Sequence, residues 1–209
     1  MSTNPMTPLA SLGAGFSNEA FGSQAVFRAV LQALSHPGRT VAVEHDAQTP
    51  AVGHAASAAV LLALLDSDCT LWLSPRLAAS DAGAWLRFHA GCTLVADAAQ
   101  ARFVWVAQGD VVPPLDSLAL GTDIYPDQSA TCVVDVPRAT VTTADISDAW
   151  HLRGPGIQNV TAPSTNAAAV FHPSSSRPLN AYSPKMSTAT IAEMIAMVVY
   201  WRFKNAPAP

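Results

Sequence analysis

The sequence predicts an α/β fold with a mostly parallel sheet that is covered on both faces. Short apolar runs of strand character alternate along the chain with longer helical segments, an order typical of parallel sheets. Half of the 209 residues are hydrophobic. The chain is therefore long and apolar enough for one domain with a buried core.

The first predicted helix follows the N-cap candidate Ser17 and ends at His36-Pro37-Gly38. Its apolar residues recur at helical spacing, and the Pro-Gly pair that follows them cannot continue a helix. The alternating, β-branched run at 39–44 predicts a strand after this turn.

A helix–strand unit then repeats. The run at 55–65 is apolar nearly all round and long for a strand, so we expect a buried helix there. The apolar run at 69–74 predicts the next strand. The elements expected after it are a helix at 78–90, strands at 93–96 and 102–107, a helical turn at 116–120, and strands at 131–136 and 150–153.

The two ends of the chain differ from this central part. Residues 1–15 are rich in Pro, Gly, Ser and Thr without periodicity, and we expect a flexible leader there. Residues 158–209 form an atypical Pro/Ser-rich tail with four basic residues against one acid, and only 186–204 has a helical pattern. We therefore predict one α/β domain at 16–157.

Composition excludes several classes of partner. Only 12% of residues are charged, and acids outnumber bases by 15 to 11, so we expect neither nucleic acid nor membrane as a partner. The few charges also indicate that other protein chains cover part of the surface. The three cysteines are far apart in sequence without a CxxC pair, which suggests neither a disulfide framework nor a metal site and fits the cytoplasm.

The sequence lacks the motifs of self-sufficient enzymes. Both lysines, Lys185 and Lys204, lie in the tail, so the predicted domain has no residue for a Schiff base with pyridoxal phosphate (PLP). No Walker loop, GxSxG, HExxH or GxGxxG pattern occurs either.

The strongest local candidate for chemistry is Arg87-Phe88-His89, near the end of a predicted helix. Its guanidinium and imidazole could hold a phosphate or phosphonate and move a proton, which makes His89 the candidate catalytic residue. The alternative, which we favour, is that Arg87 pairs with an acid and His89 caps the helix.

Two other kinds of motif could be either functional sites or plain turns. Ser35 beside His36 could be a nucleophile and its base, but the following Pro37-Gly38 favours a plain turn. The glycine loops at Gly121-Thr122 and at Gly154-Pro155-Gly156 could admit an anion to backbone amides, or could simply be turns. We favour turns for both loops.

Five segments in order resemble one family. QAVFRAVLQALSHPGR, VLLALLDSDCTLWLSP, AWLRFHAGC, LGTDIYPDQSATCVVDV and LRGPGI are similar to the H subunit of the bacterial carbon-phosphorus lyase core complex, over about residues 16–157. The resemblance implies a three-layer sandwich like the large domain of PLP-dependent transferases, but without PLP. The motif positions that match the family are Ser35, Pro37, Gly38, Arg87, Phe88, His89, Gly121 and Gly154.

The resemblance also implies a function. Such subunits form homodimers, join G, I and J subunits in the cytoplasm, and act with an ATP-binding L subunit. Together they support displacement of adenine from ATP by methylphosphonate, giving α-D-ribose 1-methylphosphonate 5-triphosphate. The subunit itself is expected to bind no cofactor, and the alternative is a non-catalytic nucleotide-binding, phosphonate-binding or scaffolding role in the same assembly.

The tail departs from the family pattern. After Ile157 the sequence shows neither an FPxGIDL-like strand nor an LPRTT-like end. We therefore hypothesise that residues 158–209 arose by a frameshift or a recent replacement.

Overall fold

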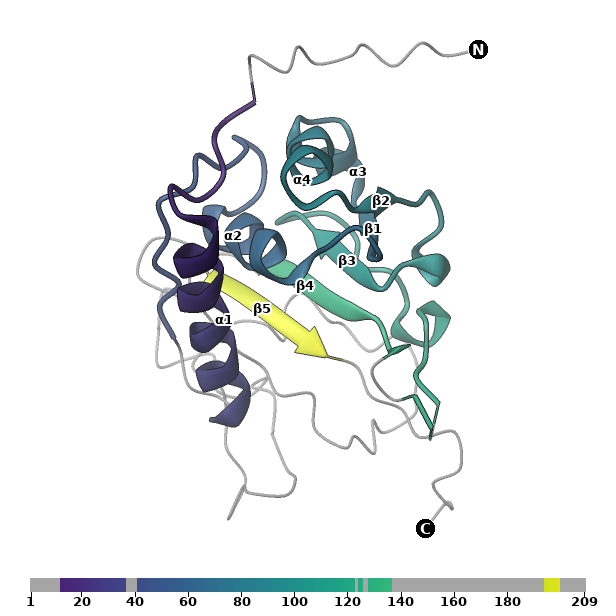
Figure 1. The fold of residues 1–209 in the computed structure, drawn as a ribbon. Coiled ribbons are helices and arrows are strands. Elements are labelled where there is room, and N and C mark those ends of the chain that lie inside the picture. Colours follow the sequence, from purple (N-terminus) through teal and green to yellow (C-terminus); the bar gives the residue numbers. More distant parts are fainter. Residues whose placement is uncertain (1–11, 37–40, 123, 126–127, 137–193, 200–209) are drawn as a thin grey trace, which may run out of the picture.

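The computed structural model describes residues 12–36, 41–122, 124–125, 128–136 and 194–199, the last of these as backbone only. Figure 1 shows helices packed beside a twisted sheet. The elements are α1 (Glu19–Ser35), α2 (Ala55–Leu64), β1 (Thr70–Leu73), α3 (Pro75–Ala78), α4 (Ala82–Ala90), β2 (Thr93–Leu94), η2 (Ala98–Gln100), β3 (Phe103–Val106), η3 (Leu115–Ser117), β4 (Thr131–Val136) and β5 (Met194–Val199).

The five strands form one sheet in the order β2-β1-β3-β4-β5. The first four run parallel, and β5 pairs antiparallel with β4, with Val136 opposite Met194 and Thr131 opposite Val199. The predicted α/β class and mostly parallel sheet are confirmed. The likeness to PLP-dependent transferases stays a prediction.

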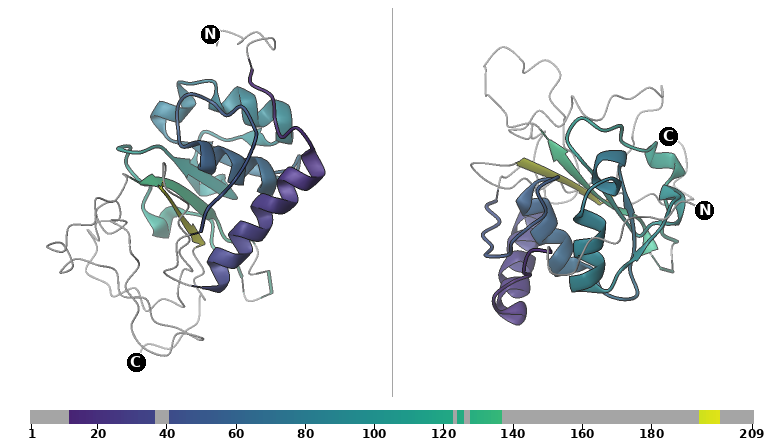
Figure 2. Two further views of the ribbon diagram at one scale, coloured as in Figure 1. Left: turned by 90° about the vertical axis from the view of Figure 1, so that its left-hand side faces the viewer. Right: turned by 90° about the horizontal axis from the view of Figure 1, so that it is seen from above.

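Both faces of the sheet are covered. Helices α1, α2 and α4 lie on one face, as the turned views in Figure 2 show. On the other face, apolar side chains of the segments 95–98, 112–115 and 118–119 cover the strands. Because each strand is buried on both sides, it reads in sequence as a continuous apolar run.

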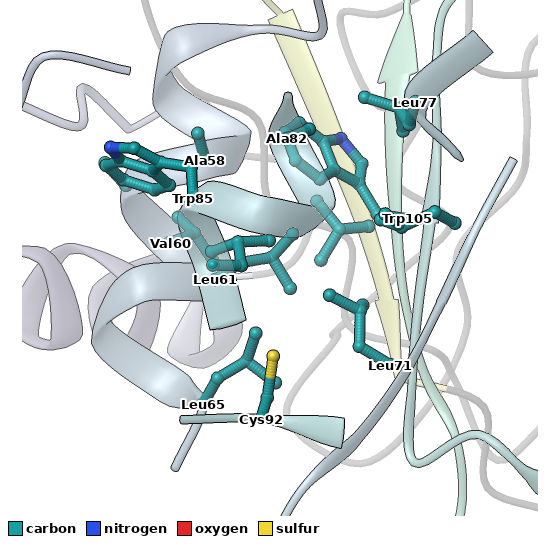
Figure 3. Packing of buried hydrophobic residues seen from close by; sticks show 14 of the residues in the cluster. Ala58, Val60, Leu61, Leu65, Leu71, Leu77, Ala82, Trp85, Cys92 and Trp105 are labelled. Atoms are coloured by element: carbon teal, nitrogen blue, oxygen red, sulfur yellow. The ribbon is translucent and has the colours of Figure 1, made fainter. Parts of the chain in front are cut away.

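The larger core lies between α2, α4 and the sheet. α2 buries most of its side chains because it packs between α1 and the sheet with α4 beside it, which fits its apolar composition. Leu71 and Trp105 point from the strands into this core, and Leu61 meets them from α2 (Figure 3). Strand alternation sends Val104 to the opposite cluster.

Helix α1 begins one residue later than predicted. Its N-cap is Asn18, whose side-chain oxygen accepts a hydrogen bond from the Phe21 amide at 3.1 Å. Ser17, the predicted cap, instead donates its hydroxyl to the Asp46 carboxylate. Ser and Asn are both good capping residues. Because the Ser17 hydroxyl is bonded to Asp46 in the 41–48 segment, Asn18 caps the helix.

The strand predicted at 39–44 is wrong for residues 41–44, which are loop. The segment that follows them pairs with the N-terminal segment, where the Gln48 amide donates to the Ala14 carbonyl at 2.9 Å. The helix expected at 78–90 is also interrupted. The Ser80 hydroxyl accepts from the Ala82 amide at 3.1 Å and so separates α3 from α4.

The helix expected at 186–204 is wrong for Met194–Val199, which is strand β5. This run contains three β-branched residues, and the open edge of β4 offers unpaired backbone groups that a strand satisfies and a helix does not. The strand predicted at 150–153 lies outside the described residues, as do residues 1–11 of the predicted leader.

Two glycines with positive φ test how tightly the core is packed. Gly53 (φ 91°) and Gly109 (φ 85°) share a backbone conformation that other residues rarely adopt. A Cβ at Gly53 would overlap the Trp105 indole and approach Leu77 Cδ2 at 2.9 Å, whereas one at Gly109 would only touch Arg76 at 3.6 Å.

We predict that Gly109→Ala lowers the free energy of unfolding by about 1–2 kcal/mol, through backbone strain alone. Gly53→Ala is expected to cost about 1–3 kcal/mol more, because it also overpacks the core. Urea unfolding followed by circular dichroism measures both. Equal losses in the two variants would show that the space around Gly53 is not restricted.

Candidate functional site

A buried carboxylate lies where β4, β3 and the start of α2 meet. Asp135 is 1% exposed. Its Oδ1 accepts hydrogen bonds from Ser57 Oγ at 2.5 Å and from Trp105 Nε1 at 3.1 Å. Its Oδ2 accepts from the His54 amide at 2.9 Å. Three donors from two other elements thus converge on one side chain.

Local structure explains this arrangement. In β4 the neighbours Val134 and Val136 point to one face, so Asp135 points to the other, toward α2. The N-cap of α2, His54, makes no side-chain cap bond. A helix start has amides without intrahelical partners and a partial positive charge, and the Asp135 carboxylate meets both needs.

Burial sets the electrostatics of this group. Desolvation raises the pKa of Asp135 above its ordinary value, while the Ser57 hydroxyl and the Trp105 indole oppose that shift. Since the carboxyl is enclosed, a substrate cannot reach it in this conformation. We therefore interpret the Asp135 network as a structural centre that joins helix to sheet.

A second polar group lies beyond the carboxyl ends of β1 and β3, the edge at which α/β sheets usually bind ligands. Arg76 Nε is 3.4 Å from Asp110 Oδ1, Arg76 Nη1 donates to the Gln108 carbonyl at 3.0 Å, and the Arg76 amide donates to Asp110 Oδ2 at 3.0 Å. The Arg76 side chain is 65% exposed. Sequence reasoning missed this pair, although an arginine two residues after a predicted strand was a usable signal.

The predicted motif Arg87-Phe88-His89 lies at the end of α4. His89 Nε2 is 2.9 Å from the Gly13 carbonyl oxygen, and Trp85 Nε1 donates to the same oxygen at 2.8 Å. A carbonyl only accepts, so Nε2 carries the hydrogen. His89 therefore holds residues 12–15, which belong to the predicted leader, against α4. Arg87 and Phe88 are exposed.

Ser35, His36 and Thr122 make local contacts in the described part of the chain. Ser35 Oγ donates to the Gln32 carbonyl at 2.9 Å and lies 2.9 Å from His36 Nδ1, at the exposed end of α1. Thr122 closes a turn with Tyr125, donating its amide to the Tyr125 carbonyl at 3.1 Å and accepting the Tyr125 amide on Oγ1 at 2.9 Å. Gly121 precedes this turn.

The structure does not bring these motifs together. The C-terminal end of α1 and helix α4 lie on opposite sides of the molecule (Figure 1). Pro37, Gly38, Gly154 and Gly156 lie outside the described residues. Within the described part of the chain, no group of three or more His, Cys, Asp or Glu side chains could hold a metal ion.

Fold and sites together define an α/β protein with a mostly parallel sheet and a buried polar centre. No helix in the described ranges is long and apolar enough to cross a membrane. The chain belongs to the family described as "Bacterial phosphonate metabolism protein (PhnH)", which it matches over residues 14–184. This match includes residues 158–184, which we expected to depart from the family.

A relative with a defined name supports the same assignment. The chain is 38% identical over 144 residues to the alpha-D-ribose 1-methylphosphonate 5-triphosphate synthase subunit PhnH of Rhizobium meliloti (strain 1021). The aligned part is 69% of this chain and 70% of the relative.

The Asp135 network predicts a pH-dependent effect of Asp135→Asn. A raised pKa in the folded state means that the wild type gains stability below pH 3.8, and this gain is lost as pH rises through the folded pKa. The neutral amide of the Asp135→Asn variant does not titrate and so adds no pH-dependent stability. The wild-type advantage in free energy of unfolding should therefore be largest at acid pH and shrink toward neutrality.

Urea titrations of both proteins between about pH 3.5 and 7 measure this difference. At neutral pH the variant should still be about 1–3 kcal/mol less stable, because an amide offers one acceptor oxygen to donors that now meet two. Asp116→Asn, at an exposed position, is the control and should change stability by less than about 0.5 kcal/mol. An advantage that grows with pH would contradict the raised pKa.

The tether formed by His89 predicts a local effect of His89→Ala. Loss of one of the two bonds to the Gly13 carbonyl, with the Trp85 bond retained, should loosen residues 12–15, so the Gln48 amide, which donates to Ala14, should exchange its hydrogen about fivefold faster. Hydrogen exchange followed by NMR or mass spectrometry measures this. Arg87→Ala is the matched control and should leave that exchange unchanged, whereas unchanged exchange in His89→Ala would refute the tether.

Proposed function

We propose that this chain is a subunit of an α-D-ribose 1-methylphosphonate 5-triphosphate synthase in phosphonate catabolism, a transferase complex. The observation that supports this most is the 38% identity to the Rhizobium meliloti synthase subunit over 69% of the chain. The family assignment over residues 14–184 places the chain in phosphonate metabolism independently of that relative.

The proposed reaction needs groups that this chain does not gather in one place. A phosphonate oxygen bonds to ribose C1′ while the bond from C1′ to adenine breaks, and adenine leaves with the electron pair and gains a proton. Proton transfer calls for a general acid near the base, and the phosphonate calls for cationic partners. In the described residues, Asp135 is enclosed and His89 Nε2 is bonded to Gly13.

We therefore assign the chain a supporting role, with the reaction completed by partners. Those proposed are G, I and J subunits and an ATP-binding L subunit, around a homodimer of this chain in the cytoplasm. ATP is a substrate of the whole complex. The chain is proposed to bind no cofactor of its own, and PLP in particular would lack a lysine, since its two lysines both lie beyond residue 184.

Its surface suits such assembly. The exposed side of α1 presents Phe21, Phe27 and Leu31, which are 71%, 45% and 48% exposed. Only Val26, Val30 and Ala33 of this helix are buried against the domain. Large apolar side chains together on one helix are typical of a surface that another chain covers.

Co-purification tests the proposal. An affinity-tagged full-length chain, co-expressed with G, I and J subunits, should retain G and I through a wash at about 0.5 M salt, because an apolar contact is not screened. The untagged chain is the control for binding to the resin. Recovery of the tagged, folded chain without G and I would exclude the subunit role.

A further inference from the structure

Two cysteines that are far apart in sequence lie on neighbouring strands. The parallel register of β1 and β2 pairs Thr70 with Thr93 and Leu71 with Leu94. The residues just before each strand, Cys69 and Cys92, therefore lie opposite each other. The Thr93 amide donates to the Cys69 carbonyl at 3.0 Å, so the pairing extends to this position.

Both side chains point to the same face of the sheet. Cys69 and Cys92 belong to the core cluster under α2 and α4, as does Leu71, two residues after Cys69. Figure 3 shows Cys92 at the margin of that cluster, beside Leu65. Neighbouring strands lie about 4.8 Å apart, and a disulfide spans Cα atoms about 4.4–6.8 Å apart. The Cα spacing expected from the register therefore falls within the disulfide range, and a small approach of the two strand starts would close the bond.

The pair lies just beneath the surface. Cys69 is 7% exposed and Cys92 is 3% exposed, and both are free thiols. The exposed turn at 66–68 lies next to the pair, and the Cys69 amide donates to the Asp66 carbonyl at 3.2 Å. Gly91, which ends α4 with φ 73°, faces Ser67 of this turn. We expect local opening of this turn to give a reagent access to the thiols.

We propose that Cys69 and Cys92 form a reversible dithiol–disulfide site, oxidised by a small-molecule disulfide. One thiol loses its proton and attacks the reagent, giving a mixed disulfide and one released thiolate. The second cysteine, as thiolate, attacks the protein sulfur of that mixed disulfide. The Cys69–Cys92 bond forms, a second thiolate leaves, and both leaving groups take up the two protons. The two cysteines are oxidised and the reagent is reduced to two thiols.

The surroundings of the thiols set the rate of this reaction. Burial is the main cause that raises the pKa of the Cys69 thiol, and the hydrogen bond to Asp66 raises it further. Burial also raises the pKa of the Cys92 thiol, with a smaller contribution from the nearby Cys69. Thiolates are therefore scarce at neutral pH, and oxidation should become about tenfold faster per pH unit below the thiol pKa. Cys132 faces the opposite cluster, and burial raises its pKa to about 12.

The experiment treats the folded, full-length chain with oxidised glutathione at several pH values from about 7 to 9, followed by alkylation of free thiols and peptide mass mapping. We expect a peptide pair joined through Cys69 and Cys92, with the loss of two hydrogen atoms, that forms faster at higher pH and disappears on reduction. Cys132→Ser is the matched control and should form the same bond. Cys69→Ser should stop at a glutathione adduct on Cys92 or remain unmodified.

The wild-type protein decides the outcome even if a variant folds poorly. Alkylation of both Cys69 and Cys92 after oxidation at pH 9, with native circular dichroism, would overturn the proposal. A persistent mixed disulfide on one of them, a bond to Cys132 or a bond between two molecules would do so as well. None of these results bears on the subunit role, which co-purification tests separately.

Discussion

The fold depends on one buried carboxylate having its donors in place. Asp135 is enclosed by α2, β3 and β4, where an ion without partners would be strongly unfavourable. The His54 amide, the Ser57 hydroxyl and the Trp105 indole offset that cost only at one separation of helix and sheet. Gly53 leaves the room that the Trp105 ring needs in this arrangement. The network thereby fixes how the first turn of α2 packs on the sheet.

Local sequence patterns predicted most helices and strands. Contacts between residues far apart in the sequence could not be predicted from such patterns. The apolar run at 55–65 and the strand-like runs at 69–74, 102–107 and 131–136 indicated α2 and a sheet buried on both faces, because those signals lie within each segment. In TCVVDV, by contrast, Asp135 looked like an ordinary strand residue, since its partner His54 is 81 positions away. The same holds for His89, whose partner Gly13 lies 76 positions away, and for the strand register that places Cys69 opposite Cys92. At Met194–Val199 the pattern predicted a helix, but the segment is a strand because it pairs with the edge of β4.

The arrangement of polar groups fits the proposed role of this chain as a subunit. The one strongly buried acid among the described residues serves the helix–sheet contact, and His89 holds the N-terminal segment, so neither is free for proton transfer. Arg76 and Arg87 are exposed on separate elements and do not form a common anion site. A domain with an apolar α1 surface and a sparsely charged sequence suits assembly better than independent catalysis.

Release of adenine in a reconstituted reaction tests the central claim most directly. Purified G, I and L subunits with ATP and methylphosphonate are assayed by chromatography with and without this chain. A subunit role predicts adenine release when the chain is present, little or none when it is omitted, and none from the chain alone. Equal release with and without the chain, or release by the chain alone, would contradict the account.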